Sequence, residues 1–453
     1  MSLSYARFVL ILLILLIFAI ASAQNPQPGA DGVGDPLFPE LGNGGYDIQH
    51  YALDLTWDDE TAVLTGVATI DAIATQDLSR FNLDLRDMTV KSVIVNDETA
   101  EFAQQSPELI ITPANFLPKA APFTVVVHYQ GVPNALIAGF EGWITTRDGV
   151  FTANEPRGAA TWYPANDHPT DKATFSFRIT VPEPFIAAAN GLLQETIDNG
   201  ATTTFVWEAR DPMATYLAAV YIGDFVVQTA TGPDGLPIRN YFPPDDADRF
   251  AKEAAVTSAM IEFFAERFGA YPFEAYGIVV VDGFSGALEN QTLSVFSTSF
   301  VREAVIAHEL AHQWFGNNVS PATWEDIWLN EGFATFAEDL WLEHAGNPQR
   351  HLPSYDAVRT LPPPGTPGQR IFNSSVYLRG GWTLQALRVR VGDDVFFEIL
   401  RTYHERFAGG VASTADFIAV AEAISGENLR AFFQGWLYDD EPPPVPELGL
   451  GLE

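Results

Sequence analysis

The feature that most constrains this chain is the pentapeptide HELAH at residues 308–312, in which a glutamate follows the first of two histidines. Residues four apart on an α-helix share one face, so His308 and His312 can bind one metal ion together. Glu309 is rotated by about 100° from the first histidine, so it faces a water on the metal and is suited to act as a general base. The pattern predicts a helix over residues 301–314 that carries a hydrolytic zinc site.

A second acidic residue completes the predicted ligand set. Glu331 lies in the sequence NEGFA at residues 330–334, and 18 residues separate it from His312. The intervening residues 317–321 contain Asn, Ser and Pro, which favour a loop that returns a second helix against the first. Two histidines and one carboxylate leave the fourth position of a tetrahedral zinc open for water. We therefore expect one Zn²⁺ on His308, His312 and Glu331.

Composition excludes several other classes of site and partner. The chain of 453 residues has no cysteine, so disulfides, thiolate metal sites and cysteine nucleophiles are impossible. Its 58 acidic and 24 basic residues give a net charge of −34, which repels nucleic acid and excludes it as a partner. A hydrophobic content of 47% and this length predict a folded chain of more than one domain.

The N-terminus has the three parts of an export signal. Arg7 precedes an apolar run at residues 8–20, and the small residues Ala21, Ser22 and Ala23 follow. This order predicts a signal peptide over residues 1–23 and a secreted or extracytoplasmic protein. The alternative is an uncleaved segment that anchors the chain to a membrane, although the apolar run is shorter than the roughly 20 residues of a typical span.

The rest of the chain divides by periodicity. Residues 24–45 are rich in Gly, Pro, Asn and Asp and predict a flexible linker. Residues 46–238 alternate apolar and polar positions between frequent turn signals, which predicts an N-terminal all-β sheet or sandwich domain. Helical periodicity begins near Asp246, with one helix expected over residues 250–268.

From this periodicity we expect a mainly helical catalytic domain at residues 239–440, followed by a Pro- and Glu-rich tail at residues 441–453. The predicted fold class is therefore α+β and multidomain, with the β domain first.

Several polar residues have two readings at this level. Glu155 lies in a proline-containing loop at residues 152–157 and is either a solvated loop residue or a functional one. Asp326 and Glu338 flank the third ligand and are either solvated helix charges or hydrogen-bond partners of a ligand histidine. Tyr377 is either a packing residue at a helix start or a hydrogen-bond donor.

These motifs together resemble one known family. The pattern HELAH, the spacing to Glu331, the sequence NEGFA and a GALEN stretch at residues 286–290 make the chain similar to the aminopeptidase N family of gluzincin metallopeptidases. The resemblance extends from about residue 46 to residue 437. It implies a thermolysin-like catalytic domain behind the β domain.

The resemblance also implies roles for particular residues. Zinc would be bound by His308, His312 and Glu331, with Glu309 as the general base. Tyr377, in the sequence SVYLRGG at residues 375–381, would donate to the oxyanion that develops during catalysis.

For the substrate, the resemblance implies that Glu289 and Glu155 bind the free α-amino group of a peptide. The other substrate-binding residues that it implies lie in the same GALEN stretch: Gly286, Ala287 and Asn290.

The sequence departs from the family pattern at three places. Leu288 stands where methionine is usual, and Ala153 stands where glutamine is usual. The sequence also ends soon after Tyr438, without the large helical C-terminal domain of many relatives. We therefore expect a short form with a more open cleft.

The expected function is that of a zinc aminopeptidase, which hydrolyses peptides with a free N-terminus. The membrane would be a partner only if the signal segment were retained. Two alternatives remain: a zinc endopeptidase with the same core, and a catalytically silent relative that binds peptides.

Overall fold

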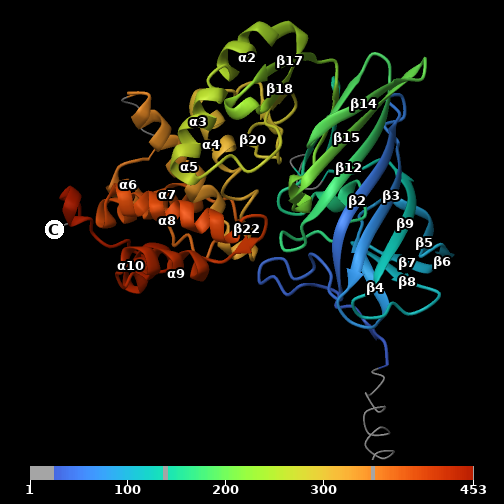
Figure 1. Cartoon of the computed structure of the whole chain (residues 1–453), viewed down its shortest axis with the longest axis horizontal. Coiled ribbons are helices and arrows are strands. Elements are labelled where there is room, and N and C mark those ends of the chain that lie inside the picture. Colours follow the sequence, from blue (N-terminus) through green and yellow to red (C-terminus); the bar gives the residue numbers. More distant parts are fainter. Residues whose placement is uncertain (1–24, 136–140, 348–351, 452–453) are drawn as a thin grey trace, which may run out of the picture.

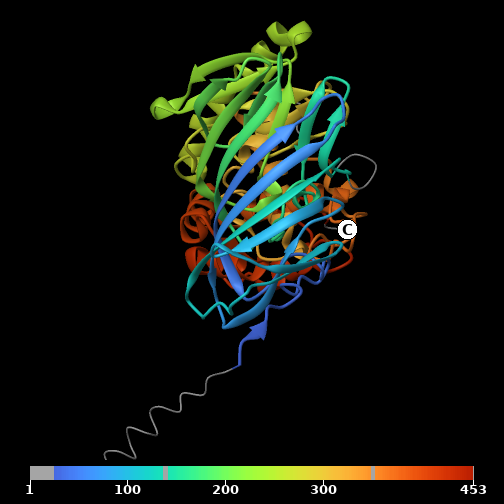
Figure 2. The same cartoon turned by 90° about the vertical axis from the view of Figure 1, so that its right-hand side faces the viewer.

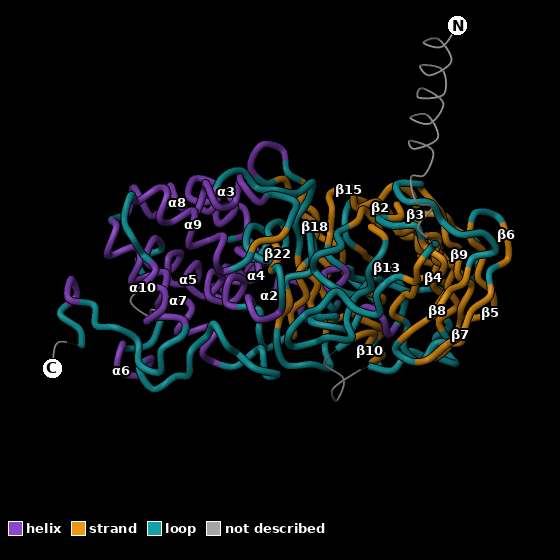
Figure 3. The backbone as a smooth tube through the Cα atoms, turned by 90° about the horizontal axis from the view of Figure 1, so that it is seen from below, coloured by secondary structure: helices purple, strands orange, loops and turns teal. Residues whose placement is uncertain are grey.

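The computed structural model describes residues 25–135, 141–347 and 352–451. A β-rich part is followed by a mainly helical part that lies beside it (Figure 1), which confirms the predicted fold class. Figure 3 shows the same division, with strands gathered on one side and helices on the other. The predicted signal peptide lies outside the described residues. Among the described residues, no helix has the length and apolar character needed to cross a membrane.

The alternating residues of the β-rich part form one large sheet. Strand β2 (Tyr46–Trp57) lies in the middle of this sheet, and buried and exposed side chains alternate along it except at a bulge between Ile48 and His50. Figure 2 shows this sheet face-on in front of the helices. The order of its eight strands is β14 (Leu192–Asp198), β15 (Thr202–Met213), β12 (Ala173–Pro182), β2, β3 (Leu64–Ala74), β9 (Pro122–Gly131), β5 (Thr89–Val95) and β6 (Glu98–Thr99).

Two four-stranded sheets complete this part. The second of them matters for function, because every residue of its strand β11 (Gly149–Ala153) is buried and Glu155 lies two residues beyond the end of that strand. One sheet has the order β1 (Gln27–Pro28), β4 (Leu78–Asp84), β8 (Glu108–Thr112) and β7 (Glu101–Gln105). The other has the order β10 (Gly142–Thr146), β11 (Gly149–Ala153), β16 (Val220–Gly223) and β13 (Ile186–Ala189).

The prediction of a flexible linker at residues 24–45 is wrong for its described part. Strand β1 pairs with β4, and Leu41 is buried. Asp35 accepts hydrogen bonds from the Trp324 backbone N–H at 2.8 Å and from the His168 ring at 3.2 Å, which joins the helical part to the β-rich part. Composition suggested flexibility because apolar residues are few, but backbone hydrogen bonds and a few buried anchors are enough to fix a segment.

The second part begins with a smaller sheet. Its order is β17 (Val226–Thr231), β18 (Pro237–Phe242), β19 (Ile278–Val281), β21 (Ser294–Ser297) and β20 (Ala287–Leu288). The predicted domain boundary after residue 238 falls inside β18, whose partner β17 lies before it. The single helix expected over residues 250–268 is two helices, α2 (Ala247–Ala254) and α3 (Thr257–Phe268).

The helices that carry the predicted site pack on one another. Helix α4 (Glu303–Ala311) contacts α5 (Trp328–His344), and α5 contacts α7 (Ser374–Val391). The remaining elements of this part are α6 (Tyr355–Val358), α8 (Asp393–Phe407), α9 (Thr414–Ser425), α10 (Arg430–Leu437) and the strand pair β22 (Ser320–Pro321) and β23 (Val411–Ala412).

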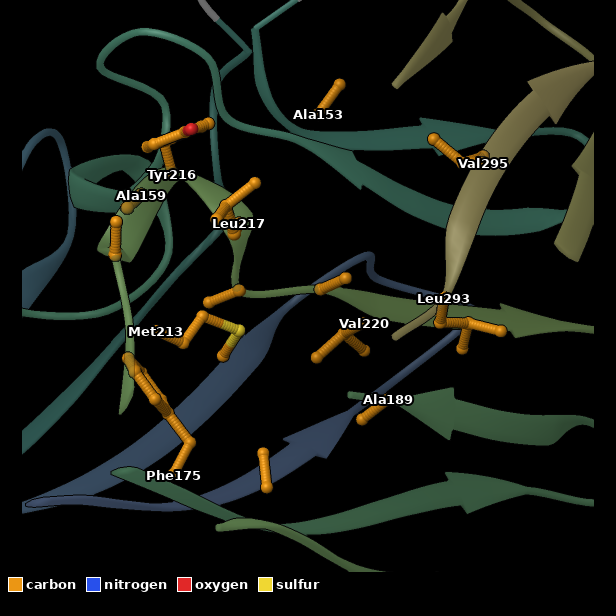
Figure 4. Packing of buried hydrophobic residues seen from close by; sticks show 14 of the residues in the cluster. Ala153, Ala159, Phe175, Ala189, Met213, Tyr216, Leu217, Val220, Leu293 and Val295 are labelled. Carbon is orange, nitrogen blue, oxygen red and sulfur yellow. The ribbon is translucent and has the colours of Figure 1, made fainter. Parts of the chain in front are cut away.

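A continuous apolar core joins the two parts. Phe175 and Val220 of the β-rich part and Leu293 and Val295 of the second part belong to one buried cluster, part of which is shown in Figure 4. The described part of the predicted tail also packs, because Val445 is buried beside α6, α7 and α10. The two parts therefore form a shared interface, and a site between them is held from both sides.

Candidate active site

Helix α4 presents the two histidines. It ends at Ala311, earlier than the predicted residue 314, but His312 keeps helical dihedral angles as its C-cap. The rings of His308 and His312 consequently face each other, with centroids 4.8 Å apart. Helix α5 then supplies Glu331 from its first turn.

The three predicted ligands meet at one point. Nε2 of His308 lies 3.2 Å from Oε2 of Glu331, and Nε2 of His312 lies 3.6 Å from the same oxygen. Zinc bonds of about 2.1 Å at tetrahedral angles would place ligand atoms about 3.4 Å apart. The observed spacings of 3.2 and 3.6 Å from the histidine nitrogens to Glu331 are close to this value, so the three residues fit a zinc site.

The outer nitrogens of both rings are already satisfied. Nδ1 of His308 donates to Oε1 of Glu338 at 2.6 Å, and Nδ1 of His312 donates to the carbonyl of Phe315 at 3.1 Å. These bonds fix the orientation of both rings, so that each Nε2 faces Glu331. This arrangement decides between the two flanking carboxylates, because Asp326 accepts from Thr414 instead.

The charges around these ligands favour a cation. Burial alone would lower the pKa of His308, yet its hydrogen bonds to Glu331 and Glu338 hold that pKa well above the usual range. Burial alone would raise the pKa of Glu331, but the two histidines lower it. A buried site in which carboxylates hold imidazoles in their charged form is short of positive charge, which a divalent ion supplies.

The remaining acidic residues of the site have raised pKa values. Burial, followed by the charges of neighbouring carboxylates, raises the pKa of Glu155. Burial also raises the pKa of Glu289 and of Glu309, although the nearby histidines act against this rise. Burial and the charge of Glu331 keep the Tyr377 phenol protonated, with a pKa well above its usual range.

The structure brings Glu155 and Glu289 to the same cavity, although they come from different parts of the chain. Glu155 follows β11 and Glu289 follows β20, and both side chains are buried. In each, Oε1 is buried without a hydrogen-bond partner among the described residues. Glu289 also offers a carboxylate oxygen within 4.8 Å of ligand atoms of Glu309 and His312. The two carboxylates therefore lie beside the metal ligands with unused acceptors.

Tyr377 comes from a third helix, α7. Its ring, on α7, stacks on the ring of His308 with centroids 6.1 Å apart. Gly286 and Ala287 line the cavity, as expected of substrate-binding residues. The Asn290 side chain instead donates to the Tyr221 hydroxyl at 2.6 Å and to the Thr152 carbonyl at 3.3 Å, so it ties the loop to β11.

The cavity itself has a volume of about 400 Å³. Carboxylates, the two histidines and Tyr377 form its polar lining, and small or apolar side chains form the rest. Its described lining residues are Ala153, Glu155, Phe284, Ser285, Gly286, Ala287, Leu288, Glu289, Phe300, Val305, His308, Glu309, His312, Glu331, Glu338, Phe372 and Tyr377.

Sequence reasoning missed the residues that hold Glu289 in place. The side-chain amides of Gln313 and Asn317 donate to the Glu289 carbonyl at 2.9 and 2.7 Å. Lys172, from the β-rich part, donates in turn to the carbonyls of Asn317 and Asn318. The available signal was the set of amide side chains after the second histidine, of which Gln313 was placed in the predicted helix and Asn317 in the predicted loop.

Comparison with known proteins gives consistent results across the chain. The model of the peptidase M1 N-terminal domain matches residues 48–217, and that of the peptidase family M1 domain matches residues 252–362. Aminopeptidase M1 of Arabidopsis thaliana is 26% identical over 460 residues, which cover 91% of this chain and 52% of the relative. Glutamyl aminopeptidase of Rattus norvegicus is 28% identical and covers 69% of this chain and 37% of the relative. The chain thus spans about half, or less, of the length of these curated relatives.

Solved structures match over nearly their full length. The crystal structure of an M1 zinc metallopeptidase from Deinococcus radiodurans has a TM-score of 0.82 and 31% identity, covering 92% of this chain and 98% of that one. A mutant of a two-domain M1 zinc metallopeptidase bound to L-tryptophan has a TM-score of 0.85 and 31% identity, covering 92% of this chain and 99% of that one. On these matches and on the geometry of its ligand set, the chain belongs to peptidase family M1, a family of zinc metallopeptidases.

Proposed function

We propose that this protein is a zinc-dependent aminopeptidase that removes single residues from the free N-terminus of peptides. One observation carries the proposal: Glu155 and Glu289 are buried beside the metal ligands, and each has an acceptor oxygen without a described partner. Two such carboxylates can bind one ammonium group. Relatives of the chain are named aminopeptidases, and an M1 mutant of Deinococcus radiodurans has been solved with a Tyr-Ser-Ala substrate.

The metal site would hold one ion. His308, His312 and Glu331 would hold zinc, and all three residues line the cavity. Zinc bound there supplies Lewis-acid activation of a water and of the scissile carbonyl.

Glu309 is the proposed general base. It lines the cavity beside the ligands, on the same helix as His308. Its carboxylate takes a proton from the attacking water and gives that proton to the leaving nitrogen. The C–N bond then breaks, and the amine leaves uncharged.

Tyr377 is the proposed donor to the oxyanion. Its phenol stays protonated in this acidic surrounding because its pKa is raised well above the usual range. A protonated phenol can donate a hydrogen bond to the negative oxygen that develops on the carbonyl, and such donors in a dry site contribute about 3 kcal/mol.

Glu155 and Glu289 would restrict cleavage to the peptide bond after the first residue of the substrate. A free α-ammonium pairs with both carboxylates, whereas a blocked or internal residue leaves them buried without a cation. Because an uncompensated buried charge costs several kcal/mol, internal bonds are disfavoured.

The test uses one peptide in two forms, with a free and with an acetylated N-terminus. We expect stepwise loss of single residues from the free form and at least about 100-fold slower cleavage of the acetylated form. Chelator should abolish the activity and zinc should restore it. Rapid internal cleavage of the acetylated peptide would identify an endopeptidase instead, and no cleavage by zinc-loaded protein would identify a binding protein.

Two variants assign the roles. Glu309→Gln should keep its zinc and lose about 100- to 10,000-fold in turnover. Glu289→Gln should keep its zinc and lose discrimination between the free and acetylated peptides. A fully active Glu309→Gln protein would refute the proposed base.

We also propose that the protein is exported. The support is the order of charged, apolar and small residues at positions 1–23. Sequencing the N-terminus of the protein recovered outside the expressing cells, compared with the membrane fraction, would separate cleavage from anchoring.

A further inference from the structure

We propose that the preferred N-terminal residue of the substrate has a large apolar side chain, of the Leu, Met or Phe type, and that acidic residues are poor substrates. This inference rests on the proposed aminopeptidase function and concerns the part of the cavity that catalysis leaves unused.

The geometry of an amino acid sets where its side chain goes. The Cα of the first residue bears the ammonium, the carbonyl and the side chain. If the ammonium lies at Glu155 and Glu289 and the carbonyl lies at the metal ligands, the side chain must contact the remaining lining. That lining consists of Ala153, Phe284, Ser285, Gly286, Ala287, Leu288, Phe300, Val305 and Phe372.

This wall, which we call the apolar wall, starts next to the ammonium site. Ala153 stands two residues before Glu155, and Leu288 stands directly before Glu289. The side chain of the first residue leaves from the atom that bears the ammonium, so these two positions are the first it meets. Ala153 is only 6% exposed and has a single methyl group, so it leaves room where a longer residue would fill the cavity.

Two aromatic members of the apolar wall, Phe284 and Phe300, pack against neighbouring side chains. The Phe284 ring packs against the buried ring of Phe151, with centroids 4.9 Å apart. Phe300 comes from the segment before α4, and the guanidinium of Arg302 lies 5.2 Å from its ring centroid. Aromatic and aliphatic side chains can pack against such rings with burial of apolar surface.

Charge excludes the acidic alternative. The described lining contains five carboxylates, of Glu155, Glu289, Glu309, Glu331 and Glu338, and neither lysine nor arginine. An acidic side chain would be desolvated among like charges. A relative is named glutamyl aminopeptidase, so the family name alone does not predict this preference.

The experiment measures kcat/KM of the zinc-loaded enzyme on Leu, Phe, Ala, Gly, Glu and Arg amides. We expect Leu and Phe to exceed Ala by at least about 10-fold and Glu by at least about 100-fold. A ranking led by Glu, Arg, Gly or Ala would overturn the inference while the aminopeptidase function stands. Loss of all six activities would instead overturn the proposed function.

Variants of the apolar wall provide an independent test. Ala153→Phe should lower kcat/KM for the Leu and Phe amides by at least about 10-fold and leave the Ala amide within about 3-fold. Ala153→Leu is the milder version if the first variant folds poorly, and it should change the ranking in the same direction. Phe116→Ala, at a 52% exposed position outside the cavity, is the control and should leave the ranking unchanged.

Arg302→Ala tests the cation that lies over the Phe300 ring of the apolar wall. If Arg302 recognised acidic side chains, this variant would lower the Glu to Leu ratio of kcat/KM. We expect a ratio within about 2-fold of the unaltered enzyme, and a fall of 10-fold or more would contradict the inference.

Discussion

The ligand histidine His308 shows how a single residue depends on its neighbours. One ring nitrogen faces Glu331, and the other donates to Glu338 at 2.6 Å. The hydrogen bond to Glu338 fixes the ring orientation and raises the electron density at the metal-facing nitrogen.

Replacing Glu338 by Gln should therefore weaken zinc binding by about 10- to 100-fold, because the amide keeps an acceptor but loses the charge. Competition with a chromophoric chelator measures the change. Asp326→Asn is the matched control, since Asp326 flanks the same helix but bonds to Thr414. Equal zinc affinity in Glu338→Gln and Asp326→Asn would contradict the assigned role.

A second histidine predicts a pH effect on stability. His404 accepts a hydrogen bond from Asn318 at 2.7 Å, and burial lowers its pKa to about 4. An unfolded histidine has a pKa of about 6.5, so the unfolded state binds more protons between pH 6.5 and 4. The contribution of this residue to stability is therefore present above pH 6.5 and is lost as the pH falls through this window.

His404→Gln should remove that dependence. We expect the free energy of unfolding of the unaltered protein to fall relative to the variant by about 3 kcal/mol between pH 6.5 and 4. Urea unfolding at several pH values measures both curves. Parallel curves would show that His404 is not held neutral in the folded state.

At the scale of elements, the site depends on a close crossing of two helices. A Cβ placed on Gly332 of α5 would lie 2.8 Å from the backbone carbon of Gly380 on α7. Glu331 precedes the first glycine, and Tyr377 lies one turn before the second. Small residues at this crossing let the metal ligand and the tyrosine approach each other.

Gly332→Ala should separate these helices. Alanine usually stabilises a helix relative to glycine by about 1 kcal/mol, but here we expect a loss of about 1–3 kcal/mol from overpacking. Displacement of Tyr377 should also lower kcat by about 10- to 100-fold. In the control Gly381→Ala, the nearest atom is the end of the flexible Leu352 side chain, at 2.9 Å, so a smaller change is expected. Similar stability and kcat in both variants would contradict the crossing argument.

At the scale of the whole molecule, side chains of the β-rich part hold the loop at residues 316–318 of the helical part in place. Nζ of Lys172 donates to the carbonyls of Asn317 and Asn318 at 2.8 and 2.9 Å, and the Asn317 amide holds the Glu289 carbonyl. The Tyr216 hydroxyl donates to the neighbouring Gly316 carbonyl at 3.0 Å. The β-rich part thereby holds in place Glu289 of the helical part, which we propose binds the ammonium group of the substrate.

Lys172→Met should leave the Asn318 carbonyl unpaired and the Asn317 carbonyl with only its 3.3 Å bond from the Ser320 hydroxyl, and should cost about 2 kcal/mol of stability. Because the loop that holds Glu289 loosens, KM should rise more than kcat falls, and the zinc content should not change. Steady-state kinetics and metal analysis test this. Lys119→Met, an exposed lysine of the same part, is the control. Unchanged KM in Lys172→Met would show that the hydrogen bonds of Lys172 do not affect substrate binding.

How much the sequence predicted depends on how local each feature is. Helix and strand periodicity predicted the β-rich part, the helical part and the metal ligands, because spacing of four residues puts two side chains on one helix face. The same periodicity predicted too long a helix α4 and predicted one helix where the structure has α2 and α3. Helix ends depend on caps and packing, which periodicity does not record.

The sequence by itself determined that His308, Glu309 and His312 lie within one helical turn, and the Glu331 motif that follows predicted a third ligand for the same metal site. Only the tertiary structure decided that Glu155 and Glu289 share one cavity and that Glu338 rather than Asp326 bonds to His308. It also decided that residues 25–45 pack against both parts of the chain. These contacts join segments far apart in the chain. Their formation depends on how whole elements pack, which no local pattern of residues records.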